Sequence, residues 1–137
     1  MKYILFSLLV LFAIPVLASQ TEIIYDSPYI VATNSPVTLK IAPTSDLYAD
    51  NCVMYAKYVL GRSEAWGVAK DIEPNSSRPE VGGVVLTTEG RFGHVAVITR
   101  ITETHILVSE ANYIPDTIST RSIPIDDPRI KGYLVLE

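Results

Sequence analysis

The reactive side chains of this chain are one thiol and two imidazoles. Cys52 is the single cysteine among 137 residues, and His94 and His105 are the two histidines. One cysteine cannot form an internal disulfide, so Cys52 is a buried inert side chain, half of an intermolecular bridge, or a reactive thiol. A thiol becomes a nucleophile when a neighbouring imidazole can take its proton. Composition alone leaves all three interpretations open.

The stretch that holds the thiol, DNCVMYAKYVLG, has the signals of an amphipathic helix. Asp50 is a suitable N-cap, apolar side chains recur four residues apart over 52–60, and Gly61 stands at the stop position. We predict a helix within 46–61, with Cys52 in the second position of its first turn. Free backbone N–H groups and the helix dipole lower the pKa of a thiol there, although the Asp50 carboxylate opposes this effect.

One histidine has acidic and amide neighbours on a predicted hairpin of strands 93–101 and 105–113. If cross-strand pairs sum to 206, His94 faces Asn112, and if they sum to 204, it faces Glu110. Both registers place these three side chains on one face of the sheet, whereas an odd sum would separate them. A carboxylate or amide at one ring nitrogen fixes the tautomer and leaves the other nitrogen free to take a thiol proton.

The remaining candidate ligands do not form a metal pattern. His105 lies beside the turn of the same hairpin, has no acidic side chain opposite, and is interpreted as a solvated strand residue. Neither an HExxH nor a paired-cysteine zinc pattern exists. Asp46 and Asp50 are too few for a calcium cage of about 6–8 oxygens. We therefore predict no metal and no cofactor.

The elements that must position these residues are one helix followed by a run of strands. Further strand-like segments are GVVLTT, TRSIPI and GYLVLE, and WGVAKD suggests a second short helix. A Pro- and Gly-containing loop precedes the first of these strands. Residues 19–45 contain two β-prone pieces, EIIY and VTLKI, and are interpreted as an N-terminal arm or edge strands. This order predicts an α+β fold with an antiparallel sheet.

The first residues have the character of an export signal. Lys2 precedes an apolar run that ends at Leu17, and small residues follow it. We predict a secretory signal peptide over 1–18. An uncleaved anchor is the alternative, because the run approaches the ~17–25 residues that span a bilayer. Either interpretation places the folded part outside the cytoplasm, secreted or in the periplasm or cell envelope, with membrane contact only through an uncleaved N-terminal segment.

The charge pattern excludes one class of partner. The net charge is -4, and the lysines and arginines beyond the N-terminus are scattered along the chain. A nucleic-acid partner usually needs a clustered basic surface, so no nucleic-acid partner is expected.

The length fits a single domain, and we predict a monomer.

Five short motifs occur in an order that resembles a known family. Asn51-Cys52 at a helix start, WGVAKD, PEVGGVVL, GHVAVI and VSEANY resemble the CHAP domain, the cysteine/histidine-dependent amidohydrolase/peptidase family of peptidoglycan hydrolases. The resemblance covers roughly residues 45–135. It implies a papain-like α+β fold of the NlpC superfamily, with the cysteine-bearing helix packed on the sheet and the catalytic domain at 46–137.

The resemblance also assigns roles. It makes Cys52 the nucleophile and His94 the general base, with Glu110 and Asn112 orienting the imidazole. The backbone N–H of the cysteine would help to hold the oxyanion of the tetrahedral intermediate. Asn51 stands where a glutamine is common in the family, so a part for its shorter side chain in the oxyanion site stays open.

The implied function is an exported thiol hydrolase that degrades cell-wall peptidoglycan. Its substrate bond would be the N-acetylmuramoyl-L-alanine amide, as in an amidase, or a peptide bond of the stem or cross-bridge, as in an endopeptidase. A protein amide as substrate is a further possibility. Two rivals come from other classes: a catalytically inactive CHAP-like module that binds the wall, and a structural protein linked through an intermolecular disulfide at Cys52.

Overall fold

The computed structural model describes residues 23–24, 30–33, 38–41 and 46–137. The signal peptide predicted for residues 1–18 lies outside the described residues, as does most of the arm predicted for 19–45. Both β-prone pieces of that arm nevertheless contain a strand, β1 (Ile23–Ile24) and β3 (Thr38–Ile41).

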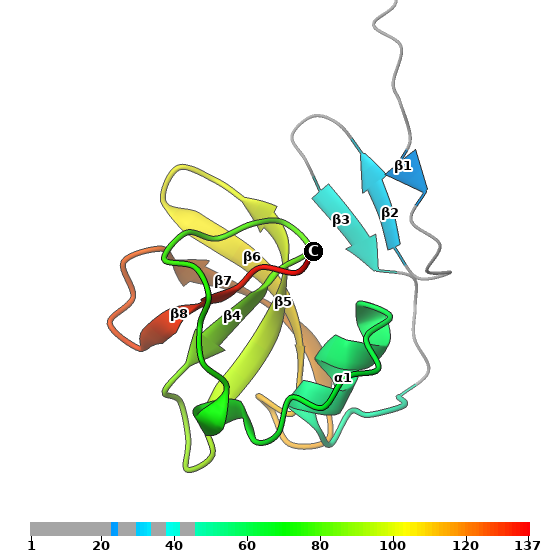
Figure 1. Cartoon of the computed structure of the whole chain (residues 1–137), viewed down its shortest axis with the longest axis vertical. Coiled ribbons are helices and arrows are strands. Elements are labelled where there is room, and N and C mark those ends of the chain that lie inside the picture. Colours follow the sequence, from blue (N-terminus) through cyan, green and yellow to red (C-terminus); the bar gives the residue numbers. More distant parts are fainter. Residues whose placement is uncertain (1–22, 25–29, 34–37, 42–45) are drawn as a thin grey trace, which may run out of the picture.

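An antiparallel sheet of eight strands forms the body of the described chain (Figure 1). Besides β1 and β3, its strands are β2 (Ile30–Thr33), β4 (Val84–Thr87), β5 (His94–Ile101), β6 (His105–Ala111), β7 (Ile118–Pro124) and β8 (Ile130–Leu134). The central strand is β5, which pairs with β4 along its first half, with β6 along its second half, and with β3 through Thr38 and Arg100. β8 extends the sheet beyond β4, and β7 extends it beyond β6.

The helix that carries the thiol, α1 (Cys52–Val59), starts later than expected. Its N-cap is Asn51, whose Oδ1 accepts a hydrogen bond from the Met54 N–H at 3.0 Å. The prediction that Asp50 caps the helix is therefore wrong, and Cys52 is the first helical residue rather than the second. Both residue types cap helices well, but turns occupy 47–50 and delay the first helical residue.

The other end of α1 is closed by a glycine, as predicted. Gly61 has φ +64°, a value that favours glycine. Its N–H bonds to the Tyr58 carbonyl, and the next N–H, from Arg62, bonds to the Lys57 carbonyl. This double closure is a Schellman motif. The second short helix expected in WGVAKD is a single 3₁₀ turn, η1 (Ala69–Asp71).

Two hydrophobic clusters bury the sheet. Tyr55, Ala56 and Val59 of α1 belong to one cluster, together with side chains of β4 and β5 such as Val84 and Val95. The residues that alternate with them on the strands form the second cluster, which contains Val85, Ala96, Ile98, Ile106, Val108, Ile123 and Tyr133. The first cluster therefore connects α1 to strands β4 and β5.

The β5–β6 register next to the first half of β5 is one of the two predicted, but its origin is different. Cross-strand pairs sum to 206 at Val97 and Ile98 and to 207 next to the turn, so a bulge at Thr99 separates the two halves. The Thr99 hydroxyl bonds to the Leu107 carbonyl across the ladder at 3.0 Å. If the register of the turn had continued, Glu110 would point to the face opposite His94. The bulge therefore restores the even sum that brings these side chains to one face.

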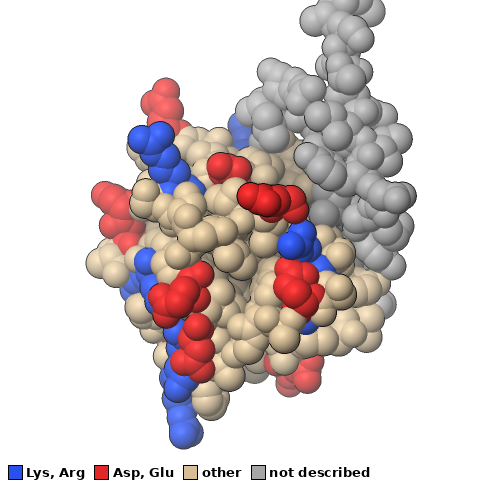
Figure 2. Space-filling view, in the orientation of Figure 1, with Lys and Arg blue, Asp and Glu red and all other residues tan. Residues whose placement is uncertain are grey.

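The charged surface shows no single-sign field on the face drawn in Figure 2, where lysine, arginine, aspartate and glutamate side chains are interspersed. Among the helices of the described residues, none has both the length and the apolar character to cross a membrane.

Candidate active site

Cys52 begins α1 and is partly exposed. Because it is the first helical residue, its backbone N–H has no intrahelical acceptor and faces outward from the helix start. Burial raises the pKa of its thiol, but hydrogen bonds from His94 and from the Val95 N–H outweigh burial, so the pKa is lowered overall. The site thus favours the thiolate, which is the nucleophilic form.

His94 is the first residue of β5 and is buried. Its Nε2 lies 2.9 Å from Oε2 of Glu110, which leaves Nδ1 as the nitrogen for the hydrogen bond that the imidazole shares with Cys52. Burial lowers the pKa of His94, but the bonds to Cys52 and Glu110 outweigh it and raise the pKa to about 9. Both shifts favour a thiolate–imidazolium pair over a neutral thiol and a neutral imidazole.

The backbone before the histidine is held by η1. Gly93 has φ +69°, and a Cβ there would lie 2.9 Å from the Lys70 nitrogen. The Lys70 N–H donates to the Phe92 carbonyl at 2.8 Å. Only glycine allows this close approach, which fixes where β5 begins and hence where His94 points.

Glu110 is the buried carboxylate of the site, with 0% of its side chain exposed. Its Oε2 accepts from His94, and Oε1 accepts from Nε of Arg121 at 3.0 Å. The predicted juxtaposition of His94 and Glu110 on one face is confirmed by this contact. By strand alternation, Glu110 shares a face with the second cluster, whereas Cys52 packs against the first, so the thiol meets the imidazole at the beginning of β5.

Asn112 has a different set of contacts from those expected. Its Nδ2 donates to the Asp50 carbonyl at 2.6 Å, and its Oδ1 accepts from the Asp116 N–H at 3.1 Å. Its φ is +60°, a conformation that asparagine tolerates better than most residues. The side chain thus ties the end of β6 to the segment before α1, and a direct role in orienting the imidazole stays a prediction.

A substitution at Asn112 separates these two roles. Asn112→Asp keeps the acceptor for Asp116 and tolerates the positive φ, but it places an oxygen against the Asp50 carbonyl. We expect the free energy of unfolding to fall by about 1–2 kcal/mol in urea denaturation, with little change in the pH dependence of Cys52 alkylation. If the alkylation profile shifts while stability is unchanged, Asn112 acts on the imidazole instead.

Arg121 is a site residue that sequence reasoning missed. From β7, it bonds Glu110 on one side and Glu89 on the other, with Nη1 and Nη2 each 2.8 Å from a Glu89 oxygen. The hydrogen bond from Arg121 is the main reason that the pKa of Glu89 is lowered, although burial opposes it. The available signal was an arginine two residues before the apolar Ile123 on a predicted strand, which alternation places on the same face.

Exposed apolar side chains follow or precede the site residues in the chain. Met54 lies two positions after Cys52, and Phe92 lies two positions before His94, and both are exposed. Tyr113 is also exposed, and its ring centroid is 5.7 Å from that of the histidine.

His105 lies beside the turn of the β5–β6 hairpin, away from Cys52 and His94. It begins β6, where Nδ1 pairs with the Thr104 hydroxyl at 2.8 Å, and it is partly exposed, as expected for a strand residue near the turn. In the described part of the chain, no group of three or more histidine, cysteine, aspartate or glutamate side chains could hold a metal ion.

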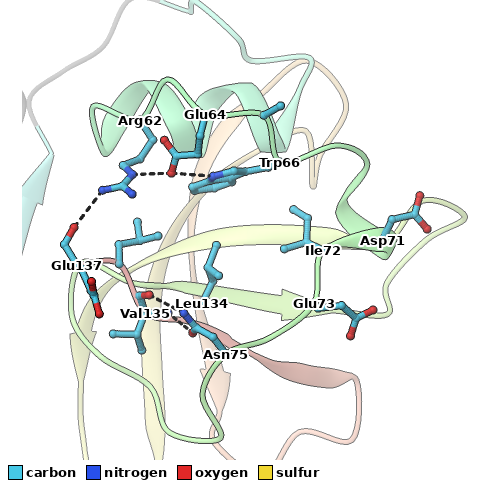
Figure 3. A pocket seen from close by; sticks show the side chains of 12 residues that line it. Arg62, Glu64, Trp66, Asp71, Ile72, Glu73, Asn75, Leu134, Val135 and Glu137 are labelled. Atoms are coloured by element: carbon cyan, nitrogen blue, oxygen red, sulfur yellow. Dashed lines mark hydrogen bonds and ion pairs between the residues drawn. The ribbon is translucent and has the colours of Figure 1, made fainter.

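A pocket of about 460 Å³ lies elsewhere on the domain (Figure 3). None of the four predicted site residues lines it. Trp66 lines this pocket, and its Nε1 donates to Oε1 of Glu64 at 3.1 Å (Figure 3). Its side chain is partly buried against the first hydrophobic cluster, to which α1 contributes. The full lining is Arg62, Glu64, Ala65, Trp66, Asp71, Ile72, Glu73, Asn75 and 134–137.

The lowered pKa of Cys52 predicts that its thiol is alkylated at a lower pH than an ordinary thiol. Because the thiolate is the reactive species, modification by iodoacetamide should approach its plateau below the ordinary thiol value of 9.0 and should fall only at lower pH. Stopped-time alkylation read by mass spectrometry measures this profile without ambiguity, since the chain has one cysteine. A midpoint at or above the ordinary value would contradict the arrangement described.

Comparison with known proteins gives two matches. The family model described as "CHAP domain" matches residues 43–112, a range that contains Cys52, His94, Glu110 and Asn112 but not Arg121. The chain is also 33% identical over 89 residues to a protein of Staphylococcus aureus named "Probable autolysin SsaALP". That alignment covers 63% of this chain and 30% of the relative, so the chain spans less than a third of that protein's length.

Proposed function

Because the chain belongs to the CHAP domain family, we propose that it is an exported cysteine peptidoglycan hydrolase that cleaves an amide bond through Cys52. The observation that carries the proposal is the contact series from the thiol of Cys52 through His94 to Glu110, with Nε2 and Oε2 2.9 Å apart. This is the geometry of an activated nucleophile, a base and a group that orients the base. The autolysin name of the Staphylococcus aureus relative supports the substrate class.

In the acylation step, the Cys52 thiolate attacks the carbonyl carbon of the amide and forms a tetrahedral intermediate. The free N–H groups at the start of α1, that of Cys52 first among them, are placed to stabilise its oxyanion. The imidazolium of His94 then gives its proton from Nδ1 to the leaving nitrogen. The C–N bond breaks, and a thioester to Cys52 remains.

In the deacylation step, neutral His94 takes a proton from water as the water attacks the thioester. The second tetrahedral intermediate expels the thiolate and releases a carboxylic acid, which restores the thiolate–imidazolium pair. Glu110 serves both steps, because its bond to Nε2 keeps Nδ1 toward the sulfur. Asn112 contributes by fixing Asp50, next to the N-cap of α1.

The proposal extends to the scissile bond, to the compartment in which the enzyme acts and to the papain-like fold. The scissile bond is either the muramoyl–alanine amide or a peptide bond of the stem or cross-bridge, and both fit one acyl-enzyme mechanism. The apolar run within residues 1–18 supports export to the cell envelope or medium. A helix start that presents a thiol to a histidine at the beginning of the central strand of an antiparallel sheet supports a papain-like arrangement.

The lone thiol allows a direct test of this function. Purified peptidoglycan is incubated with the full chain, either untreated or fully alkylated by iodoacetamide, and the released fragments are identified by mass spectrometry. We expect fragments only from the untreated protein. A new L-alanine N-terminus together with a free muramoyl carboxyl group identifies an amidase, and a new amine within the peptide identifies an endopeptidase.

Other outcomes contradict the proposal in distinct ways. Fragments that persist after complete alkylation would exclude the thiol mechanism. No fragments from either sample, with the protein folded and sedimenting with peptidoglycan, would favour the inactive wall-binding module. A disulfide-linked dimer that is separated by reductant on electrophoresis would favour the structural protein.

A further inference from the structure

We propose that Arg121, held by Glu89, is a positioning residue of the site: it holds the carboxylate of Glu110 aimed at His94. The inference rests on the proposed thiol–imidazole chemistry but not on the identity of the substrate. Arg121 lies outside the residues that match the family model. The side-chain hydrogen bonds of Arg121 go to Glu110 and Glu89, so it would act on His94 and Cys52 through Glu110.

The need for such a residue follows from the burial of Glu110. Its side chain is 0% exposed, and the charged or titratable groups in contact with it are His94 from β5 and Arg121 from β7. Burial of a carboxylate is costly unless cations and hydrogen-bond donors compensate its lost hydration. His94 alternates between charged and neutral forms during the proposed reaction, so Arg121 is the permanent compensating cation.

The guanidinium of Arg121 bridges the carboxylates of Glu110 and Glu89. Nε and Nη2 bond the two oxygens of Glu110 at 3.0 and 3.1 Å, while Nη1 and Nη2 bond those of Glu89 at 2.8 Å each. The planar group cannot rotate without breaking one pair of bonds. Glu89 therefore sets the orientation of Arg121, and Arg121 sets the orientation of Glu110.

Glu89 is itself fixed from the far side. The Thr87 hydroxyl donates to its Oε2 at 3.0 Å, and Nη1 of Arg129 donates to its Oε1 at 2.8 Å. Arg129 also forms an ion pair with Asp127, in which Nη2 and Oδ2 are 2.6 Å apart. The side chains of Arg121 and Glu89 are 17% and 11% exposed, whereas that of Arg129 is 52% exposed. The ionic series thus connects the exposed Arg129 to the fully buried Glu110 through Glu89 and Arg121.

A second contact couples the same guanidinium to the histidine. Its Cζ lies 3.7 Å from the centroid of the Tyr113 ring, a cation–π geometry. The Tyr113 ring in turn packs at 5.7 Å from the His94 ring. Arg121 therefore supports both neighbours of the imidazole, the carboxylate at Nε2 and the aromatic ring beside it.

Loss of the guanidinium has a predictable result at the imidazole. Arg121→Met would remove the two bonds, from Nε and Nη2, that hold the carboxylate of Glu110 against His94. A carboxylate released from this position stabilises the imidazolium less, because its bond to Nε2 is no longer fixed. The thiolate of Cys52 then forms only at higher pH.

The test compares Arg121→Met with Arg129→Met in the full chain, because both arginines bond Glu89 but only the first bonds Glu110. The pH dependence of Cys52 alkylation by iodoacetamide is the measurement, with circular dichroism melting as the control for folding. For Arg121→Met, we expect the midpoint to rise by about one pH unit or more, which slows alkylation near pH 6 by roughly tenfold. For Arg129→Met, we expect a shift of less than about 0.3 unit.

An unchanged or lower midpoint in Arg121→Met, or equal shifts in the two variants, would overturn the proposal. If Arg121→Met does not fold, Arg121→Lys provides the same test, because lysine keeps the charge but cannot bond two carboxylates as a fork. A smaller upward shift is expected there, and no shift overturns the proposal.

A double-mutant cycle identifies the route of the effect. In a Glu110→Gln background the carboxylate is already absent, so adding Arg121→Met should not move the midpoint further. A full additional shift would mean that Arg121 acts by another route, and the proposal would fail. Alkylation is read without peptidoglycan, so the result stands apart from whether the protein hydrolyses the wall.

Discussion

Cys52→Ala is expected to lower the rate of peptidoglycan digestion by about 10⁴–10⁶-fold, since removal of a nucleophile leaves only the contributions of binding and oxyanion stabilisation. The substitution removes a partly exposed sulfur at the helix start and leaves the Asn51 cap bond to Met54 intact. The melting temperature should therefore change little. Release of dye-labelled fragments from purified peptidoglycan measures the rate, and circular dichroism measures the fold.

Cys52→Ser is the informative companion of this variant. Serine is nearly the same size and can accept the same hydrogen bonds, but its hydroxyl is far harder to ionise than a thiol, so we expect a comparable loss of digestion. Activity retained by either variant would show that the bond is broken without the thiol. The lone cysteine would then have only a packing or linking role.

His94→Gln is expected to lower digestion by about 10³–10⁴-fold and to raise the pKa of Cys52. Burial raises the thiol pKa, and the histidine bond that outweighs burial is lost in this variant. The glutamine amide can still donate to Glu110, which limits damage to the buried carboxylate. The alkylation midpoint reports the change at the thiol, and the digestion rate reports the loss of the proton donor and acceptor.

The matched control is the same substitution at the other histidine. His105 lies at the opposite end of the hairpin from His94, bonded to Thr104. His105→Gln should leave both the digestion rate and the alkylation midpoint within a factor of about two. Equal losses in the two variants would mean that histidine substitution harms the fold rather than the reaction.

The strands were the most predictable part of the fold. Runs of valine, isoleucine and leucine such as GHVAVITRI and HILVSEANY produced strands with ends within about two residues of those expected. The helix was predicted, but its start was not. Asp50 and Asn51 are both good N-caps, and the turns before them, set by long-range contacts such as that from Asn112, decided between the two.

The site was predictable as a set of residues but not as a network. Face-sharing of His94 and Glu110 followed from strand alternation, although the prediction assumed that the turn alone sets the register. The bulge at Thr99 was not visible in the sequence, because β-branched residues occur equally in regular ladders. Arg121 was missed because its partners, Glu89 and Glu110, come from different strands and loops, and their pairing exists only in the folded chain.

The bulge at Thr99 also makes the hairpin suitable for peptide grafting. The register has been corrected before the ladder reaches Val97, so the spacing of residues at the tip does not determine where His94 points. The eight residues of β5 place that tip roughly 25 Å from the thiol end. An epitope or targeting sequence spliced between Thr102 and Thr104 would extend a surface loop while the reactive end of the sheet keeps its geometry.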